Sequence, residues 1–181
     1  MAGMAILPIL CIPDPLLRET SEPVETFDDN LKTLVADMFE TMYEAPGIGL
    51  AAVQVGVPKR VLVIDLQDPV EEDGPPVKDP RVFVNPKLLE ESDTLVPYKE
   101  GCLSIPDQYA DVLRPDRVRA RWQDVEGAFH EGEIDGLLAV CLQHEIDHLN
   151  GVLFIDHLSR LKREMLIKKL NKGRREGTIA A

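Results

Sequence analysis

Residues 144–148, with the sequence HEIDH, combine residue types and spacing that suit metal-dependent hydrolysis. They follow an apolar run and precede Asn150-Gly151, a pair typical of a helix end. On a helix, residues four apart lie on one face, so His144 and His148 could bind the same ion. Glu145 could then take a proton from a metal-bound water without binding the metal. The alternative is a helix whose two histidines merely face solvent.

A catalytic metal site usually has three protein ligands, and the two histidines supply only two of them. Two metallopeptidase patterns place that ligand downstream, either as a histidine at position 154 or as a glutamate about twenty residues further on. Phe154 and the stretch 168–170 (KKL) occupy these places. Cys102 follows Gly101 in a segment too short for a helix, and it is the candidate from elsewhere in the chain. A buried, inert thiol is the more frequent role of a free cysteine.

The composition is typical of a soluble globular protein, with 44% hydrophobic and 29% charged residues. The length predicts one domain, residues 1–181. We expect no membrane span and no secretion signal, because no apolar run is long enough and the first residues lack a basic segment. Three cysteines do not form a disulfide framework, which favours the reducing cytoplasm.

The net charge of −12 is unevenly distributed along the chain. Residues 159–181 hold eight Lys or Arg and two Glu, whereas residues 1–158 hold twelve basic and thirty acidic groups, a net charge of −18. An acidic body repels nucleic acid, so the basic C-terminal segment is the one region expected to contact it. A solvated helix face is the alternative for this segment.

Hydrophobic periodicity predicts the elements that must position the candidate residues. It predicts helices at about 31–42, at 159–172 and around the HEIDH sequence, with Asp135-Gly136 as the cap of the last. The final helix would have an apolar stripe of Leu161, Met165, Leu166 and Leu170. Strands are expected at 61–65, 82–90, 112–124 and 128–133, an exposed acidic loop at 67–80, and a disordered tail beyond Gly173.

Three separated stretches of this sequence resemble the peptide deformylase family: 47–54 (GIGLAAVQ), 100–104 (EGCLS) and 143–148 (QHEIDH). The resemblance covers most of residues 5–165. It implies an α+β fold, in which antiparallel β-strands wrap around a central metal-binding helix, with a long C-terminal helix of the Gram-negative type. It also implies a cytoplasmic bacterial enzyme that removes the formyl group from the N-terminal methionine of nascent polypeptides and releases formate.

The family also implies which residues perform the chemistry. Glu145 would be the general base and acid, acting with a metal-bound hydroxide. The side-chain amide of Gln54 and the backbone N–H of Leu103 would form the oxyanion hole. The metal would be one divalent ion, Fe²⁺ by resemblance, with Zn²⁺ as the alternative and Ni²⁺ or Co²⁺ as substitutes. The residues that would bind it are Cys102, His144 and His148.

The same resemblance implies that the partners are N-formylmethionyl peptides. We also expect the protein to be a monomer. Ile48 and Gly101 would pair with the peptide backbone, and Glu100 would form a structural ion pair with Arg114. Cys141 would line the pocket, since a fourth protein ligand would close the metal site. The basic C-terminal helix adds a hypothesis of docking on ribosomal RNA. The residues expected to bind substrate are Ile48, Gly49, Tyr98, Glu100, Gly101, Leu137, Val140 and Cys141.

Two rival functions remain open from the residues alone. A zinc metallopeptidase would release amino acids from unblocked peptides, but it lacks its usual third ligand after His148. A non-catalytic module with structural zinc would need four ligands and would have to recruit Cys141.

Overall fold

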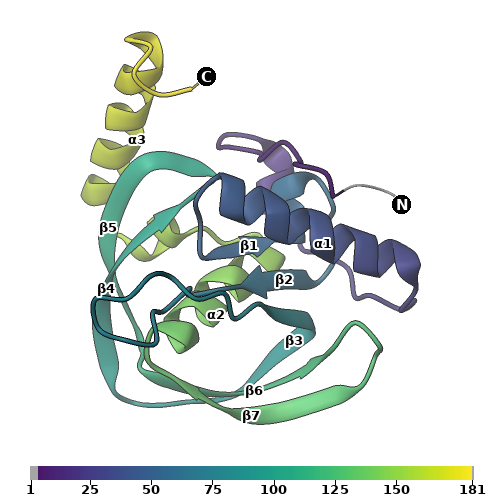
Figure 1. Cartoon of the computed structure of the whole chain (residues 1–181). Helices are drawn as coiled ribbons and strands as arrows, with labels where there is room; N and C mark the ends of the chain where they lie inside the picture. Colours follow the sequence, from purple (N-terminus) through teal and green to yellow (C-terminus); the bar gives the residue numbers. More distant parts are fainter. Residues whose placement is uncertain (1–3, 181) are drawn as a thin grey trace.

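Two antiparallel sheets and three α-helices make up the computed structural model, which describes residues 4–180 (Figure 1). The smaller sheet pairs β4 (Leu95–Cys102) with β5 (Ile105–Pro115). The larger sheet has the strand order β1-β2-β3-β6-β7, and all its neighbours are antiparallel. The fold is therefore α+β, as expected. The strands of the larger sheet are β1 (Gly49–Ala51), β2 (Val61–Ile64), β3 (Arg81–Glu91), β6 (Arg117–Gln123) and β7 (Phe129–Asp135).

Helix α2 (Gly136–Leu149) carries the HEIDH sequence and packs against strands of both sheets. Every residue from 139 to 146 is buried. A helix that is buried on all sides is part of the core, and strands wrap around this one as the family resemblance implies. The helix ends at Asn150, and Gly151 follows with φ +71°. The predicted cap is wrong in one detail, because the side chain of Asp135 makes no capping hydrogen bond.

Helix α1 (Asp29–Glu44) lies across the larger sheet (Figure 1). The Asp28 carboxylate accepts the backbone N–H of Leu31, which satisfies one free donor of the first turn. The apolar face packs on side chains of β1, β2 and β3. This confirms the predicted helix and extends it by two residues at each end. The buried residues of the helix are Leu31, Val35, Met38, Thr41 and Met42.

Helix α3 (Arg160–Arg175) projects from the body of the molecule at the end of the chain (Figure 1). Leu166 and Leu170 are buried in a cluster with residues of β5, but Leu161 and Met165 are exposed. The predicted apolar stripe is therefore half wrong. The disordered tail is wrong too, because Ile179 packs on the same cluster. None of the helices in residues 4–180 combines the length and the apolar character that a membrane span requires.

Most predicted strands are confirmed, but the one at 112–124 is wrong. The strand is interrupted between Pro115 and Arg117. The first part belongs to β5 in the smaller sheet, and the second part is β6 in the larger sheet. The 67–80 loop is exposed along most of its length, as predicted. Three 3-10 turns complete the described chain: η1 (Pro15–Arg18), η2 (Ala52–Val55) and η3 (Phe154–His157).

Candidate metal centre and active site

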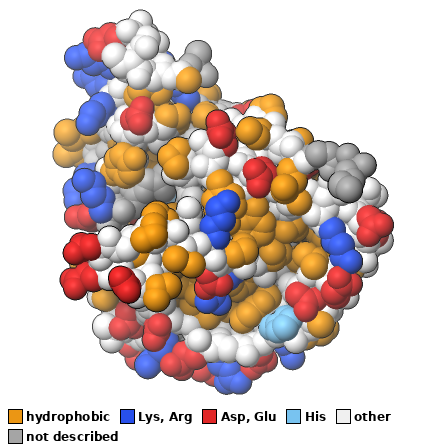
Figure 2. All heavy atoms as spheres, in the orientation of Figure 1, with side chains coloured by type: hydrophobic (Ala, Val, Ile, Leu, Met, Phe, Trp, Pro, Cys, Tyr) orange, Lys and Arg blue, Asp and Glu red, His pale blue; other side chains and the backbone are white. Residues whose placement is uncertain are grey.

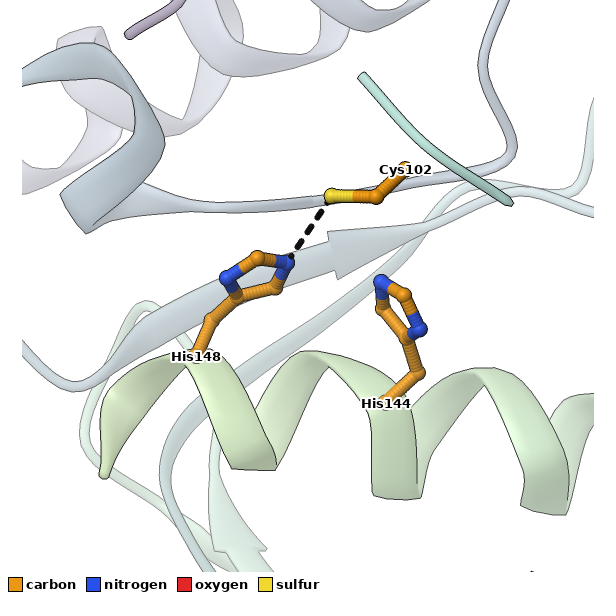
Figure 3. A group of neighbouring side chains, drawn as sticks. All are labelled: Cys102, His144 and His148. Carbon is orange, nitrogen blue, oxygen red and sulfur yellow. Dashed lines mark hydrogen bonds between the residues drawn. The ribbon is translucent and has the colours of Figure 1, made fainter. Parts of the chain in front are cut away.

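Strand β4 and helix α2 bring a cysteine and two histidines together (Figure 3). Cys102 is the last residue of β4, and its Sγ lies 3.3 Å from Nε2 of His148. His144 lies one helical turn before His148, and their ring centroids are 5.1 Å apart. The candidate ligand atoms of all three residues lie within 4.8 Å of one another.

These donors fit a divalent metal ion. Two imidazole nitrogens and a thiolate suit a borderline-soft ion and leave a coordination position open. Burial and nearby positive charges hold the pKa of His148 well below its usual value, so its ring is neutral. Burial would lower the pKa of His144, but hydrogen bonds with Cys102 and Glu100 raise it well above its usual value. Metal binding at this site therefore releases a proton.

Cys141 does not complete a four-ligand site. Within residues 4–180, the group placed to share an ion consists of Cys102, His144 and His148. Burial and the carboxylate of Glu145 raise the pKa of the Cys141 thiol to about 12. A metal-binding cysteine is a thiolate, so this protonated thiol suits a cavity wall.

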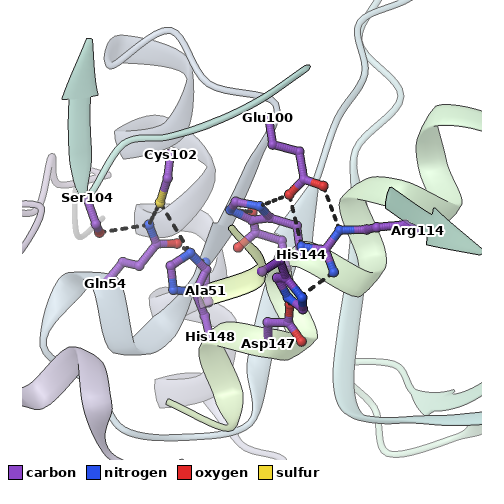
Figure 4. Close-up of polar contacts among 11 residues, drawn as sticks. Ala51, Gln54, Glu100, Cys102, Ser104, Arg114, His144, Asp147 and His148 are labelled. Carbon is purple, nitrogen blue, oxygen red and sulfur yellow. Dashed lines mark hydrogen bonds and ion pairs between the residues drawn. The ribbon is translucent and has the colours of Figure 1, made fainter. Parts of the chain in front are cut away.

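A buried ion pair holds the ring of His144 (Figure 4). Its Nδ1 lies 2.7 Å from Oε1 of Glu100, which leaves Nε2 for an ion. Arg114 donates to both oxygens of Glu100, from Nε at 2.6 Å and from Nη2 at 2.9 Å. Burial would raise the pKa of Glu100, but hydrogen bonds from His144 and Arg114 hold it below its usual value. The carboxylate is therefore charged and fixed at both oxygens.

Glu145 has a buried carboxylate that the protein leaves partly unpaired. Its Oε2 is buried without a hydrogen-bond partner, and Oε1 lies 3.9 Å from Nε2 of His144. The backbone of Gly49 lies close to the carboxylate of Glu145, since a Cβ added at Gly49 would lie 2.6 Å from Oε1. Burial raises the pKa of Glu145 to about 7. Such a carboxylate can gain or lose a proton near neutral pH.

The amide of Gln54 is held in one orientation. The backbone N–H of Ala51 donates to its Oε1 at 2.9 Å, which assigns the other end of the amide as the donor. Its Nε2 donates to Oγ of Ser104 at 3.0 Å and lies 3.5 Å from Sγ of Cys102 (Figure 4). One amide hydrogen is therefore fixed by Ser104, and the other points toward the candidate ligands.

A cavity of about 670 Å³ opens beside these residues. All the predicted catalytic and substrate-binding residues line it, whereas His148 is not among the lining residues and is 1% exposed. Sequence reasoning gave no role to Ser104 or Asp147, although both lie inside recognised motifs. It did not single out Tyr109, whose ring covers Gly101 at the cavity wall. The predicted residues on the wall are Ile48, Gly49, Gln54, Tyr98, Glu100, Gly101, Cys102, Leu103, Leu137, Val140, Cys141, His144 and Glu145.

Known proteins are similar to this chain in both sequence and fold. The family model described as Polypeptide deformylase matches residues 6–164. A peptide deformylase of Rhizorhabdus wittichii is 64% identical over 95% of this chain and 97% of its own length, and one of Zymomonas mobilis is 66% identical over the same shares. The crystal structure of a peptide deformylase from Legionella pneumophila superposes with a TM-score of 0.86 at 46% identity, covering 98% of this chain and 100% of that one. The chain thus belongs to the peptide deformylase family.

Proposed function

We propose that Cys102, His144 and His148 hold one divalent metal ion and that Glu145 moves the proton in the reaction of this family. The chain is an enzyme of protein biosynthesis that removes the N-formyl group from nascent polypeptides. One observation carries the assignment of residues. Three ligand atoms lie within 4.8 Å of one another, beside the buried and unpaired Oε2 of Glu145.

Proton transfer is the part of the reaction that falls to Glu145. When bound, the metal ion would supply Lewis acidity, lowering the pKa of water and polarising the formyl carbonyl. Glu145 would accept the proton of the attacking water and return it to the departing amine. Burial raises the pKa of Glu145 in the metal-free chain, which favours a group that must be a base first and an acid afterwards.

Gln54 and Leu103 would stabilise the negative charge that develops on the formyl oxygen. The Gln54 amide donates to Ser104 through one hydrogen, and its second hydrogen points toward Sγ of Cys102, one of the proposed ligands. The backbone N–H of Leu103 follows Cys102 directly, and Leu103 lines the same cavity. Losing one such donor typically lowers turnover by about 10²- to 10³-fold. Replacing Gln54 with Glu would be worse than replacing it with Ala, because a second negative charge would face the oxyanion.

The cavity would take the methionine side chain against its apolar wall, formed in part by Gly49, Tyr98, Leu137, Val140 and Cys141. The backbones of Ile48 and Gly101 would pair with the peptide as an added strand. Glu100 also reaches this wall, but both of its oxygens are already engaged by Arg114 and His144. Its proposed role is therefore to hold His144 beside the substrate.

Metal analysis combined with a formate assay tests this assignment. We propose Fe²⁺ as the working ion, with Zn²⁺ as the alternative and Ni²⁺ or Co²⁺ as substitutes, because the donor set accepts all four. Protein purified without oxygen should contain about one ion per chain and release formate from formyl-Met-Ala-Ser. Glu145→Gln should keep the ion and lose about 10²- to 10⁴-fold in turnover.

The rival functions give different results in the same assay. A metallopeptidase would release amino acids from Met-Ala-Ser without a formyl group. A structural zinc module would bind its ion through four ligands and release no formate with any variant. Either result, or a metal content that survives Cys102→Ala unchanged, would refute the proposed assignment.

We also propose the domain organisation, the oligomeric state, the cellular location and a ribosomal partner of the enzyme. Residues 1–181 would form one domain and act as a monomer, with 159–181 as a basic C-terminal helix and tail. A cytoplasmic location is supported by the three free cysteines. Docking on ribosomal RNA is supported by the basic side chains along α3, seen at the upper left in Figure 2. Lys162, Lys168 and Lys169 are exposed there.

A further inference from the structure

A chain of hydrogen-bonded charges runs from His144 to the molecular surface. Its inner part links His144 to Glu100 and Glu100 to Arg114 (Figure 4). Arg114 also donates from Nη1 to Oδ2 of Asp147 at 3.0 Å. Nε2 of His157 lies 2.8 Å from the same oxygen. A charged carboxylate only accepts, so this nitrogen of His157 carries the proton.

Exposure increases at the outer end of this chain. The side chains of Arg114 and Glu100 are 5% and 6% exposed, that of Asp147 is 23% exposed and that of His157 is 38% exposed. Arg114 therefore lies between one carboxylate that the core fixes and one that water can reach. The donor that competes with water for Asp147 at this outer end is His157.

The segment that carries His157 is anchored by contacts other than those of the His157 imidazole. Phe154 and Ile155 of η3 are each 1% exposed within a hydrophobic cluster. The carboxylate of Asp156 accepts from the backbone N–H of Leu153 at 2.9 Å and pairs with Arg18 at 2.5 Å. The contact between His157 and Asp147 is therefore an addition to a segment that is already anchored.

We propose that His157 is a positioning residue for the metal site. By donating to Asp147, it holds that carboxylate against Arg114, and Arg114 and Glu100 in turn fix the ring of His144. Replacing a group that holds a metal-binding histidine directly costs about 10- to 100-fold in metal affinity. Three side chains separate His157 from His144, so we expect about a three- to tenfold loss, at or below the lower limit of that range.

The test uses the full chain and measures Zn²⁺ affinity by competition with a chelator, together with the absorption spectrum of the Co²⁺ form. His157→Phe and His157→Met remove the donor while keeping a side chain of similar length. His157→Gln keeps an N–H donor. The matched control is His130→Phe, because Nε2 of His130 lies 2.7 Å from Oδ2 of Asp124 in a similarly exposed pair on the β6–β7 hairpin.

We expect His157→Phe and His157→Met to bind Zn²⁺ about three- to tenfold more weakly and to shift the Co²⁺ bands. His157→Gln should stay within about twofold of wild type, as should His130→Phe. If one donor-free variant fails to fold, the other decides. Unchanged affinity and spectrum in a folded donor-free variant overturn the proposal. An equal loss in His157→Gln overturns it as well, because packing rather than the hydrogen bond would then be responsible.

This inference rests on the proposed role of His144 as a ligand, and the two can fail separately. A wild-type chain that binds no Zn²⁺ would refute the ligand set itself. Normal wild-type binding with unaffected His157 variants would refute only the positioning role.

Discussion

The carboxylate of Glu145 is confined by its neighbours more than by hydrogen bonds. A Cβ at Gly49 would lie 2.6 Å from one oxygen, and the other oxygen has no hydrogen-bond partner among residues 4–180. Desolvation of this kind stabilises the neutral form of an acid and raises its pKa. The same confinement that makes the group a suitable proton carrier also makes its charged form costly to the fold.

Replacing Glu145 with Gln should therefore stabilise the metal-free protein in a pH-dependent way. The folded-state pKa is raised from 4.5 to about 7, so the wild-type chain loses stability as pH rises through that window. The variant has no such charge. Its stability advantage should grow by on the order of 3 kcal/mol between about pH 4 and pH 8. Denaturant unfolding with a chelator present measures this, and a constant difference across pH would contradict the burial argument.

Gly49→Ala should lower turnover while leaving the metal in place. The new Cβ would lie 2.6 Å from Oε1 of Glu145 and 3.1 Å from its Cδ, so the carboxylate must rotate away. A displaced catalytic group commonly costs about 10²-fold in turnover. Gly132→Ala on β7 is the control, because nothing lies within 4 Å of its added Cβ. Steady-state formate release compares the two, and equal activities would show that Gly49 does not confine Glu145.

At this scale, local spacing predicted some roles and missed others. The four-residue separation of His144 and His148 is set by the helix itself, so sequence alone could place them on one face. Ser104 and Asp147 act through partners that lie 50 and 33 residues away in the chain. No local pattern encodes those contacts, so their roles become visible only when the fold brings the partners together.

The turn that follows α2 is closely packed against the start of the chain. Gly151 has φ +71°, and a Cβ there would lie 2.3 Å from the carbonyl oxygen of Arg18. The Arg18 side chain also donates to the Gly151 carbonyl at 3.4 Å. This turn therefore couples the end of the HEIDH helix to η1 near the start of the chain.

Gly151→Ala should be much more destabilising than Gly177→Ala. Both glycines have φ +71°, so both changes carry the backbone cost of about 1–2 kcal/mol. Only Gly151 adds a clash with backbone, because nothing lies within 4 Å of a Cβ at Gly177. We expect a total loss of about 3 kcal/mol or more at Gly151. Denaturant midpoints of the two variants measure the difference, and similar losses would show that the Arg18 backbone yields easily.

The sequence predicts an element correctly where its hydrophobic periodicity is complete. The prediction fails where the chain passes from one sheet to the other, or where an apolar face of a helix stays exposed. The alternation of apolar and polar residues is complete only from Arg117 to Gln123, and the Pro115-Asp116 pair interrupts it where the chain changes sheets. Leu161 and Met165 fit a helical stripe, but they face solvent because the cluster around β5 covers only the turns of Leu166 and Leu170. Periodicity gives a face to each element, and only packing decides whether that face is covered.

The whole molecule separates its charges between an acidic body and a basic terminal helix. The fold places α3 at one end of the molecule, so the separation seen along the sequence is also a separation in space (Figure 1). Leu166 and Leu170 hold the helix on the body, so deleting it would also remove core residues. Charge reversal is the better test of its partner.

Lys162→Glu combined with Lys169→Glu should weaken binding to ribosomes and make it less dependent on salt. Each lost phosphate contact lowers the slope of log affinity against log salt by about 0.7 to 0.9. We therefore expect the slope to fall by about 1.5 for the pair. Lys78→Glu with Lys87→Glu is the control, since both lysines are exposed on the acidic body. Sedimentation at several salt concentrations measures the effect, and equal losses in the two pairs would exclude specific docking through α3.

The partner contacts of Cys102 span 46 residues of sequence, from the end of β4 to the last histidine of α2. During synthesis, a growing chain consequently cannot bring the three proposed ligands together until His148 has been added and α2 has folded. On the proposed assignment, each copy becomes able to bind its metal ion only after most of it has been translated. Any deformylation of this nascent chain in that period must therefore come from molecules finished earlier.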